Sequence, residues 1–202
     1  LIIYRIMAKV PVILMGETGC GKTSLIRELN KLINDGEEKM KVVNIHPGIN
    51  DESLTKIMDE TIILAGKTSG LLWVFFDELN TCDSLGLLTE IFINRTYNGI
   101  PINDNIRIIG ACNPYRKKRE DIQREVGLSH GNEQNQKLVY LVNLLPQSLL
   151  FYVFNFGAIE PEDEEEYITS IISPLFIEQE NVLNERTKDV IFQCHKHLRD
   201  VV

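Results

Sequence analysis

The sequence predicts a three-layer α/β sandwich around a parallel, five-stranded sheet, followed by a smaller helical part. First, short apolar runs rich in β-branched and aromatic residues alternate with stretches of helical spacing, which is the order of a doubly wound fold. Second, these runs are apolar at nearly every position, as strands covered on both faces are. Third, the 202 residues are 44% hydrophobic and 25% charged, which suffices for one sizeable core.

Four of the apolar runs are expected to form buried strands. They cover residues 12–15, 42–45, 71–76 and 106–112, and residues 138–144 are the candidate for the fifth strand. Helical spacing marks the segments that follow the first four runs, at residues 22–33, 52–65, 84–94 and 117–126. Strand and helix therefore alternate over residues 1–145, which we expect to form one large α/β domain.

The remaining residues, 146–202, are expected to form a helical domain. Pro146 opens this part, and helices are expected at residues 147–155, 162–172 and 177–198. The chain starts at Leu1 and stops at Val202 directly after a charged helical pattern. We therefore expect it to be a piece of a longer protein and its helical domain to be incomplete.

Composition excludes several classes of function. A net charge of −8 argues against direct nucleic-acid binding, which needs clustered Lys and Arg. Arg5 and Lys9 interrupt the apolar start, so no membrane span or signal peptide is expected. The four cysteines form no CxxC pair, which argues against zinc or a disulfide framework and favours a reducing, cytoplasmic setting.

A glycine-rich GxxxxGKT segment follows the first strand and precedes the first helix. Such a loop turns successive backbone N–H groups toward an anion at the positive end of the helix. Lys22 is expected to reach the β- and γ-phosphates of ATP, and the Thr23 hydroxyl to bind Mg²⁺. The residues expected to surround the phosphates are Gly16, Glu17, Thr18, Gly19, Cys20, Gly21, Lys22, Thr23 and Ser24.

Two adjacent acids end the apolar strand over residues 71–76. Neighbouring side chains of a strand point to opposite sides, so Asp77 and Glu78 are expected to have different roles. Asp77 suits the coordination of Mg²⁺ beside Thr23, whereas Glu78 suits the polarisation of an attacking water. The second acid also argues against a Ras-like GTPase, which orients its water with glutamine.

A polar residue closes the strand over residues 106–112. An amide such as that of Asn113 can both donate and accept, so it can hold a water against the γ-phosphate. An Asn-Pro pair is also a common turn. As the third motif in this order, Asn113 is interpreted as the sensor.

With these three motifs in order, the chain resembles the AAA+ superfamily of P-loop NTPases. Walker A corresponds to residues 16–23, Walker B to residues 72–78 and sensor 1 to Asn113. More specifically, MGETGCGKT, FFDELNT, GACNPYRK, LVYLVNLLP and FNFG are similar to an AAA+ module of the mysterin-like giant ubiquitin ligases of the RING-finger class. The resemblance covers residues 10–175 and implies ATP and Mg²⁺ as cofactors, with residues 146–202 as the helical lid.

The resemblance also implies partners. Mysterin-like proteins are similar to dynein and midasin in that they fuse several AAA units in one chain, so the expected partners are neighbouring AAA+ modules and, through the parent protein, the ubiquitination machinery. Ligase chemistry is expected elsewhere, because no Cys/His array occurs here. Two elements of the family match no motif: candidates for the arginine finger are Arg116, Arg119 and Arg124, and those for sensor 2 are Arg186 and Arg199.

Three functions stay open at this point. The first is an ATPase motor unit, which Glu78 beside Asp77 together with Asn113 favours. The second is a nucleotide-binding scaffold without turnover. The third is a P-loop small-molecule kinase, which would need an arginine-rich lid that is not visible between Asn113 and Gly157.

Overall fold

The computed structural model divides the chain into two units, Leu1–Gly157 and Ala158–Val202. It describes residues 1–115, 142–157, 163, 166–170, 190 and 193. The helix expected at residues 117–126 lies outside the described part, as does most of the helix expected at 177–198. Of the helix expected at 162–172, the described residues Asp163 and 166–170 are helical.

A parallel five-stranded sheet forms the centre of the first unit, with the strand order β2-β3-β6-β1-β7. Its strands are β1 (Val12–Gly16), β2 (Met40–Asn44), β3 (Leu72–Asp77), β6 (Ile106–Cys112) and β7 (Val153–Gly157). The α/β fold expected from the sequence is thus confirmed. Its first four strands lie where the apolar runs predict them.

The fifth strand is not the one expected. Residues 142–144 of the candidate at 138–144 lie outside any strand, and β7 takes the open edge of β1 instead. The helix predicted over 147–155 shrinks to α5 (Gln147–Leu150). The Ile13 amide donates to the Tyr152 carbonyl at 3.1 Å, and the Val and Phe residues that follow suit the strand that pairs with β1. The first unit therefore ends at Gly157, past the boundary expected at residue 145.

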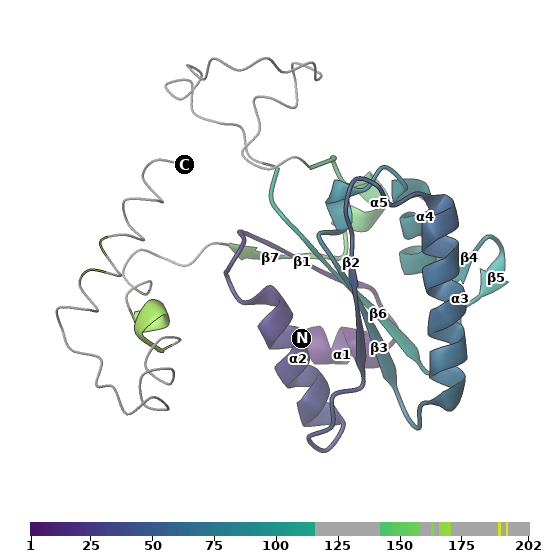
Figure 1. Cartoon of the computed structure of the whole chain (residues 1–202), viewed down its shortest axis with the longest axis horizontal. Coiled ribbons are helices and arrows are strands. Elements are labelled where there is room, and N and C mark those ends of the chain that lie inside the picture. Colours follow the sequence, from purple (N-terminus) through teal and green to yellow (C-terminus); the bar gives the residue numbers. More distant parts are fainter. Residues whose placement is uncertain (116–141, 158–162, 164–165, 171–189, 191–192, 194–202) are drawn as a thin grey trace, which may run out of the picture. The chain divides into compact units, whose positions relative to one another are not determined.

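Helices cover both faces of the sheet (Figure 1). On one face lie α1 (Ile2–Met7), which the sequence did not predict, and α2 (Lys22–Ile33). On the other lie α3 (Asp51–Lys67) and α4 (Leu85–Thr89). The single helix predicted at 84–94 is α4 followed by one π-helical segment, η2 (Glu90–Asn94).

Two apolar clusters hold these layers together, one on each face. Ile6 of α1 and Ile26 of α2 pack with Trp73, Phe75 and Ile109. On the α3 face the buried aromatic rings of Phe76 and Phe92 lie 5.6 Å apart, and α3 contributes Leu54, Met58 and Ala65 to the same cluster. Alternate residues of the central strands β1, β3 and β6 thus enter opposite cores, which explains why these strands are apolar at nearly every position.

A short hairpin follows η2 and is fastened to α3. Its strands are β4 (Thr96–Tyr97) and β5 (Ile100–Pro101). The two-residue turn at Asn98 and Gly99 has φ of 48° and 75°, the left-handed values that favour Asn-Gly. The Tyr97 hydroxyl donates to Asp59 Oδ1 and the Asn98 side chain to Thr55 Oγ1, both at 2.8 Å.

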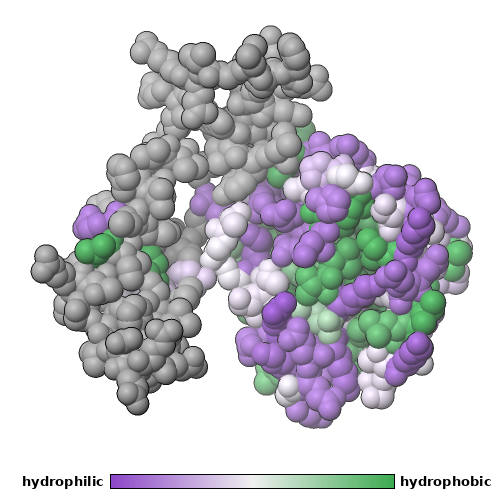
Figure 2. Space-filling view, in the orientation of Figure 1, coloured by the Kyte–Doolittle hydropathy of each residue, from purple (hydrophilic) through white to green (hydrophobic). Residues whose placement is uncertain are grey.

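The surface of the first unit has both hydrophobic and hydrophilic areas. Figure 2 shows a hydrophobic area bordered by hydrophilic side chains over the region between β2 and α3. Val42, Val43 and Ile49 line a shallow pocket there, together with the polar side chains of Lys41 and His46. Within the described ranges, every helix is too short or too polar to cross a bilayer.

Candidate active site

The loop from β1 to α2 is shaped by three glycines. β1 ends at Gly16 and α2 begins at Lys22. Gly19 and Gly21 have φ of 86° and 85°, which L side chains rarely adopt. A Cβ on Gly16 would lie 2.8 Å from both Cys20 Sγ and the Gly157 carbonyl oxygen, closer than atoms pack. These positions therefore require glycine, and the loop curls as the sequence predicts.

The Lys22 ammonium lies on the inside of this loop. Its Nζ donates to the carbonyl oxygens of Gly16 at 2.7 Å and Glu17 at 2.8 Å, and lies 3.8 Å from Cys20 Sγ. The side chain is buried although it is charged. The carbonyl groups thus hold a cation beside the N-terminus of α2, where its charge adds to the positive end of the helix.

Thr23, in the first turn of α2, lies beside Asp77 at the end of β3. Thr23 Oγ1 donates to Asp77 Oδ2 at 3.0 Å. Asp77 Oδ1 accepts from the backbone amide of Glu78 at 3.0 Å, so both carboxylate oxygens are oriented. The hydroxyl and the carboxylate together present hard oxygen atoms at the mouth of the loop.

Glu78 turns away from Asp77, although it is the next residue. Its backbone leaves the strand with φ of 55°, in the left-handed region that is uncommon for residues other than glycine. Thr81 holds this turn, since its amide and its hydroxyl both donate to the Glu78 carbonyl at 2.9 Å. The Glu78 side chain is exposed, so its carboxylate is open to water.

Asn113 follows β6, which lies between β3 and β1 in the sheet. The preceding residue, Cys112, pairs with Met15 of β1 and places Asn113 level with the start of the loop. Asn113 is 7% exposed. Its backbone is bound by the side chain of Asn80: Asn80 Nδ2 donates to the Asn113 carbonyl at 2.9 Å, and the Asn113 amide donates to Asn80 Oδ1 at 3.3 Å.

The other residues expected at the loop are placed as follows. Thr18 and Ser24 are exposed, and the Glu17 amide donates to the Gly157 carbonyl at 3.0 Å. The candidate arginines lie outside the described residues, namely Arg116, Arg119, Arg124, Arg186 and Arg199.

Two of the cysteines in this part of the structure, Cys82 and Cys112, are buried. Burial raises the pKa of Cys112 to about 12, and the nearby Lys22 offsets this only in part. Burial also raises the pKa of Cys82. Both thiols are therefore protonated at neutral pH and act as small apolar side chains.

The sequence reasoning missed Asn80, which lies at the site, and Asn143, whose side chain holds the segment that follows Asn80. Asn80 binds the backbone of Asn113, and Asn143 donates its own amide to the Asn80 carbonyl at 2.7 Å. The Asn143 side chain also donates to the Cys82 carbonyl at 3.0 Å. The signals in the sequence were the FFDELNT and LVYLVNLLP motifs, which contain Asn80 and Asn143 without indicating their partners.

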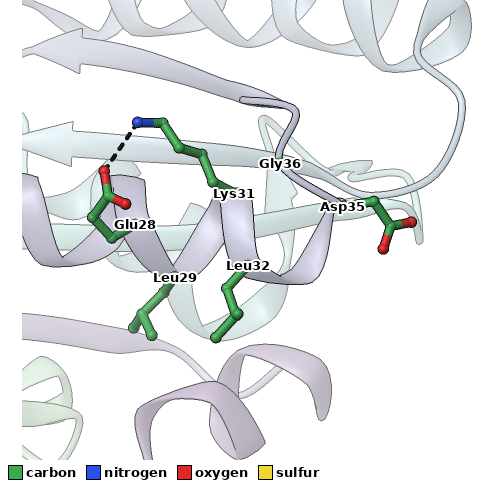
Figure 3. A pocket seen from close by; sticks show the side chains of 6 residues that line it. All are labelled: Glu28, Leu29, Lys31, Leu32, Asp35 and Gly36. Carbon is green, nitrogen blue, oxygen red and sulfur yellow. Dashed lines mark hydrogen bonds and ion pairs between the residues drawn. The ribbon is translucent and has the colours of Figure 1, made fainter.

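A separate pocket lies at the far end of α2, away from the loop (Figure 3). Leu29 and Leu32 point to one side of the helix, and Glu28 and Lys31 form an ion pair of 2.9 Å on the other. It holds none of the residues that the motifs predict at the site.

Comparisons with known proteins place this chain among its relatives. The model of the RNF213 AAA domain family matches residues 1–116. The chain is 36% identical over 190 residues to E3 ubiquitin-protein ligase rnf213-beta of Danio rerio and 33% identical over 193 residues to E3 ubiquitin-protein ligase RNF213 of Homo sapiens. These matches cover 83% and 85% of this chain but only 4% of each relative.

A more distant match is to a protein of another name. The chain is 28% identical over 153 residues to the vesicle-fusing ATPase of Dictyostelium discoideum, which covers 62% of this chain and 21% of that protein. The family model covers more than half of the 202 residues, and the fold agrees with it. The chain therefore belongs to the RNF213 AAA domain family.

Proposed function

We propose that this chain binds ATP with Mg²⁺ at the loop between β1 and α2 and hydrolyses it with Glu78 as the general base. The observation that carries the proposal is the 3.0 Å hydrogen bond from Thr23 to Asp77. It joins the helix after the phosphate loop to the acid at the end of β3, two elements that in P-loop NTPases hold one metal ion between them.

The residues at this point fit Mg²⁺. A hydroxyl and a carboxylate are hard oxygen ligands, and Mg²⁺ is typically bound by one or two such protein groups while water and phosphate oxygens fill its other positions. Among the residues that the structure describes, no cluster of three or more His, Cys, Asp or Glu side chains could hold a metal on its own. When bound, the ion neutralises charge on the phosphates.

Three side chains at the site, those of Lys22, Glu78 and Asn113, would each have a separate role in hydrolysis. Lys22 would exchange its contacts with the Gly16 and Glu17 carbonyls for oxygens of the β- and γ-phosphates, which places its charge where charge develops. Glu78, exposed and turned away from the metal ligands, would accept a proton from the attacking water. The Asn113 side chain would orient that water against the γ-phosphate.

Our proposal for the surroundings of the site is based on the family. The relatives named E3 ubiquitin-protein ligase are about 25 times longer than the matched segment, since it covers 4% of each. We propose that the full-length protein is such a ligase in the cytoplasm, that neighbouring AAA+ modules close this site, and that an arginine from one of them completes it. The residues after Gly157 would then be the start of a helical lid.

Two variants test binding and turnover separately. Lys22→Ala in the full-length protein should abolish high-affinity ATP binding at this site, measured with a fluorescent ATP analogue while the P-loop lysines of other modules are mutated. Lys31→Ala is the matched control, because Lys31 lies on the same helix but pairs with Glu28 on its exposed side. Unchanged affinity in a folded Lys22→Ala protein would rule out the proposed cradle.

Glu78→Gln should retain ATP and slow single-site turnover roughly 10²- to 10⁴-fold, since Gln keeps the shape but cannot serve as a base. Glu60→Gln, at an exposed position of α3, is the control. If the wild type binds ATP but releases no phosphate from this site even with its neighbours present, the chain is a nucleotide-binding scaffold instead.

A further inference from the structure

Asn80 lies between the two polar residues that would face the attacking water. We infer that it is a positioning residue, which sets the place of Asn113 relative to Glu78 through its side-chain amide. This inference rests on the hydrolysis proposed above. It concerns a residue that touches neither nucleotide nor metal in that proposal, so its effect should appear in the rate of turnover and not in binding.

The amide of Asn80 matches the peptide groups of Asn113 in both directions. Its Nδ2 donates to the Asn113 carbonyl at 2.9 Å and its Oδ1 accepts from the Asn113 amide at 3.3 Å. Asn80 is 2% exposed and Asn113 is 7% exposed. Buried backbone groups without partners are costly, so this reciprocal pair fixes where β6 ends and in which direction the Asn113 side chain leaves it.

The other end of the connection is the turn that carries Glu78. Asn80 lies in η1 (Leu79–Thr81), which starts directly after Glu78. The turn is closed by the two hydrogen bonds from Thr81 to the Glu78 carbonyl, both at 2.9 Å. A displacement of Asn80 therefore moves the Glu78 turn as well. The Asn80 side chain thus fixes the position of the proposed base, Glu78, relative to the proposed sensor, Asn113.

The contacts of the nucleotide cradle do not include Asn80. Lys22 is held by Gly16 and Glu17, and Thr23 is held by Asp77. Loss of the Asn80 amide should therefore leave ATP affinity within about threefold of wild type. Turnover should fall roughly 10- to 100-fold, because displacements of about 1 Å in a reacting geometry have effects of this size.

The sharpest variant is Asn80→Asp, which keeps the shape and tests the hydrogen-bond direction. One carboxylate oxygen can still accept from the Asn113 amide, but the other faces the Asn113 carbonyl and can donate to it only when protonated. Burial beside a carbonyl favours the protonated form. The ratio of variant to wild-type kcat should therefore rise as the pH falls from 8 to 5.5, while the ATP affinities stay alike.

Asn143→Ala is the matched control. The Asn143 side chain donates to the Cys82 carbonyl at 3.0 Å and to Asp83 Oδ1 at 3.1 Å, so its loss removes two hydrogen bonds from the same segment without touching Asn113. We expect its kcat to stay within about threefold of wild type. A merely structural role of Asn80 would instead make both variants lose activity in proportion to their stability.

The experiment measures ATP affinity and single-site kcat in the full-length protein against pH for wild type, Asn80→Asp, Asn143→Ala and Glu78→Gln. A kcat of Asn80→Asp equal to wild type at pH 8, with Glu78→Gln slow, overturns the inference alone. If the wild type binds ATP and Glu78→Gln turns it over at the same rate as the wild type, the proposed hydrolysis is overturned. Hydrogen exchange supplies a readout without any variant: rapid exchange of the Asn113 amide in the wild type would show that the pairing with Asn80 does not form.

Discussion

Thr23 and Asp77 are 54 positions apart in the chain, yet Thr23 Oγ1 donates to Asp77 Oδ2 at 3.0 Å. The contact crosses the strand that separates them, because β6 lies between β1 and β3 in the sheet. The first turn of α2 therefore lies over the carboxyl end of β6, and Thr23 reaches β3 from there. The hydroxyl and the acid reach the same point from two elements that are not neighbours.

Replacement of Thr23 by Val keeps the shape and removes the hydroxyl. We expect the Mg²⁺-dependent part of the ATP affinity to fall about 10- to 100-fold, the size of effect seen when groups around a metal are lost. Thr23→Ser keeps the hydroxyl and should stay near wild type. The measurement is ATP affinity over a series of Mg²⁺ concentrations with a chelator as baseline. Equal Mg²⁺ dependence of the Val variant and wild type would remove Thr23 from the metal site.

Gly16→Ala should destabilise the first unit by about 1–3 kcal/mol, as additions to a tightly packed site do. The new Cβ would meet Cys20 Sγ and the Gly157 carbonyl oxygen at 2.8 Å. Gly66→Ala is the control, since a Cβ there meets nothing within 4 Å and Gly66 lies inside α3. It should raise stability by up to about 1 kcal/mol. Denaturant unfolding of both variants decides the matter, and equal stability of the two would contradict the close approach at Gly16.

The hairpin gives a pH-dependent contribution to stability. Burial, aided by the hydrogen bond to Asp59, raises the pKa of Tyr97 to about 12. An unfolded tyrosine ionises near pH 10, so the folded state holds this proton more tightly. The contribution is complete below about pH 10 and is lost as the pH rises from about 10 to 12.

Tyr97→Phe should therefore lower the free energy of unfolding by about 1 kcal/mol at pH 8, where the hydrogen bond is intact. The difference between wild type and variant should shrink between pH 10 and 12. Other groups that titrate in this window, such as Cys112, are common to both proteins and cancel in the comparison. Urea unfolding at pH 8 and pH 11 measures this difference in the free energy of unfolding. Tyr115→Phe is the control, because Tyr115 is exposed. A constant difference over this range would contradict the assignment.

Turnover per site should be far lower in the isolated 202-residue chain than in the full-length protein. An arginine supplied by a neighbour contributes about 10³- to 10⁵-fold to the rate in related P-loop enzymes. A cooperative thermal transition first establishes that the isolated chain is folded, and the P-loop lysines of the other modules are mutated in the full-length protein. Equal rates in the two forms would mean that the site is complete within this chain.

The local sequence was enough to predict those elements whose apolar spacing and flanking residues match the environment that they have in the fold. The helix predicted at residues 22–33 is α2 with the same bounds, because glycine precedes it and its apolar spacing meets one face of the sheet. The curled backbone of the loop between β1 and α2 was equally predictable, since Gly19 and Gly21 have positive φ and Gly16 has no room for a side chain. Asp77 and Thr23 could be paired from motif order, and their contact follows from that order.

Other features depend on contacts that no local pattern contains. The first residues of β7 were predicted as the end of a helix at 147–155, although Val153 and Phe154 are residue types that suit a strand. That this short run is a strand is decided by its pairing with the open edge of β1. Asn80 reads as an ordinary turn residue, since its role is visible only once β6 brings the Asn113 backbone beside it. The left-handed φ of Glu78 is likewise set by the turn that Thr81 closes, not by the residue itself.

Gly157 is the last residue of β7, and its carbonyl oxygen accepts the hydrogen bond from the Glu17 amide. The polypeptide thus leaves the sheet at the phosphate loop itself. Gly157 also pairs with Gly16 of β1, so the end of β7 is bound both to the strand before the loop and to the loop itself. A displacement of the loop at Glu17 would therefore be passed directly to the end of this edge strand.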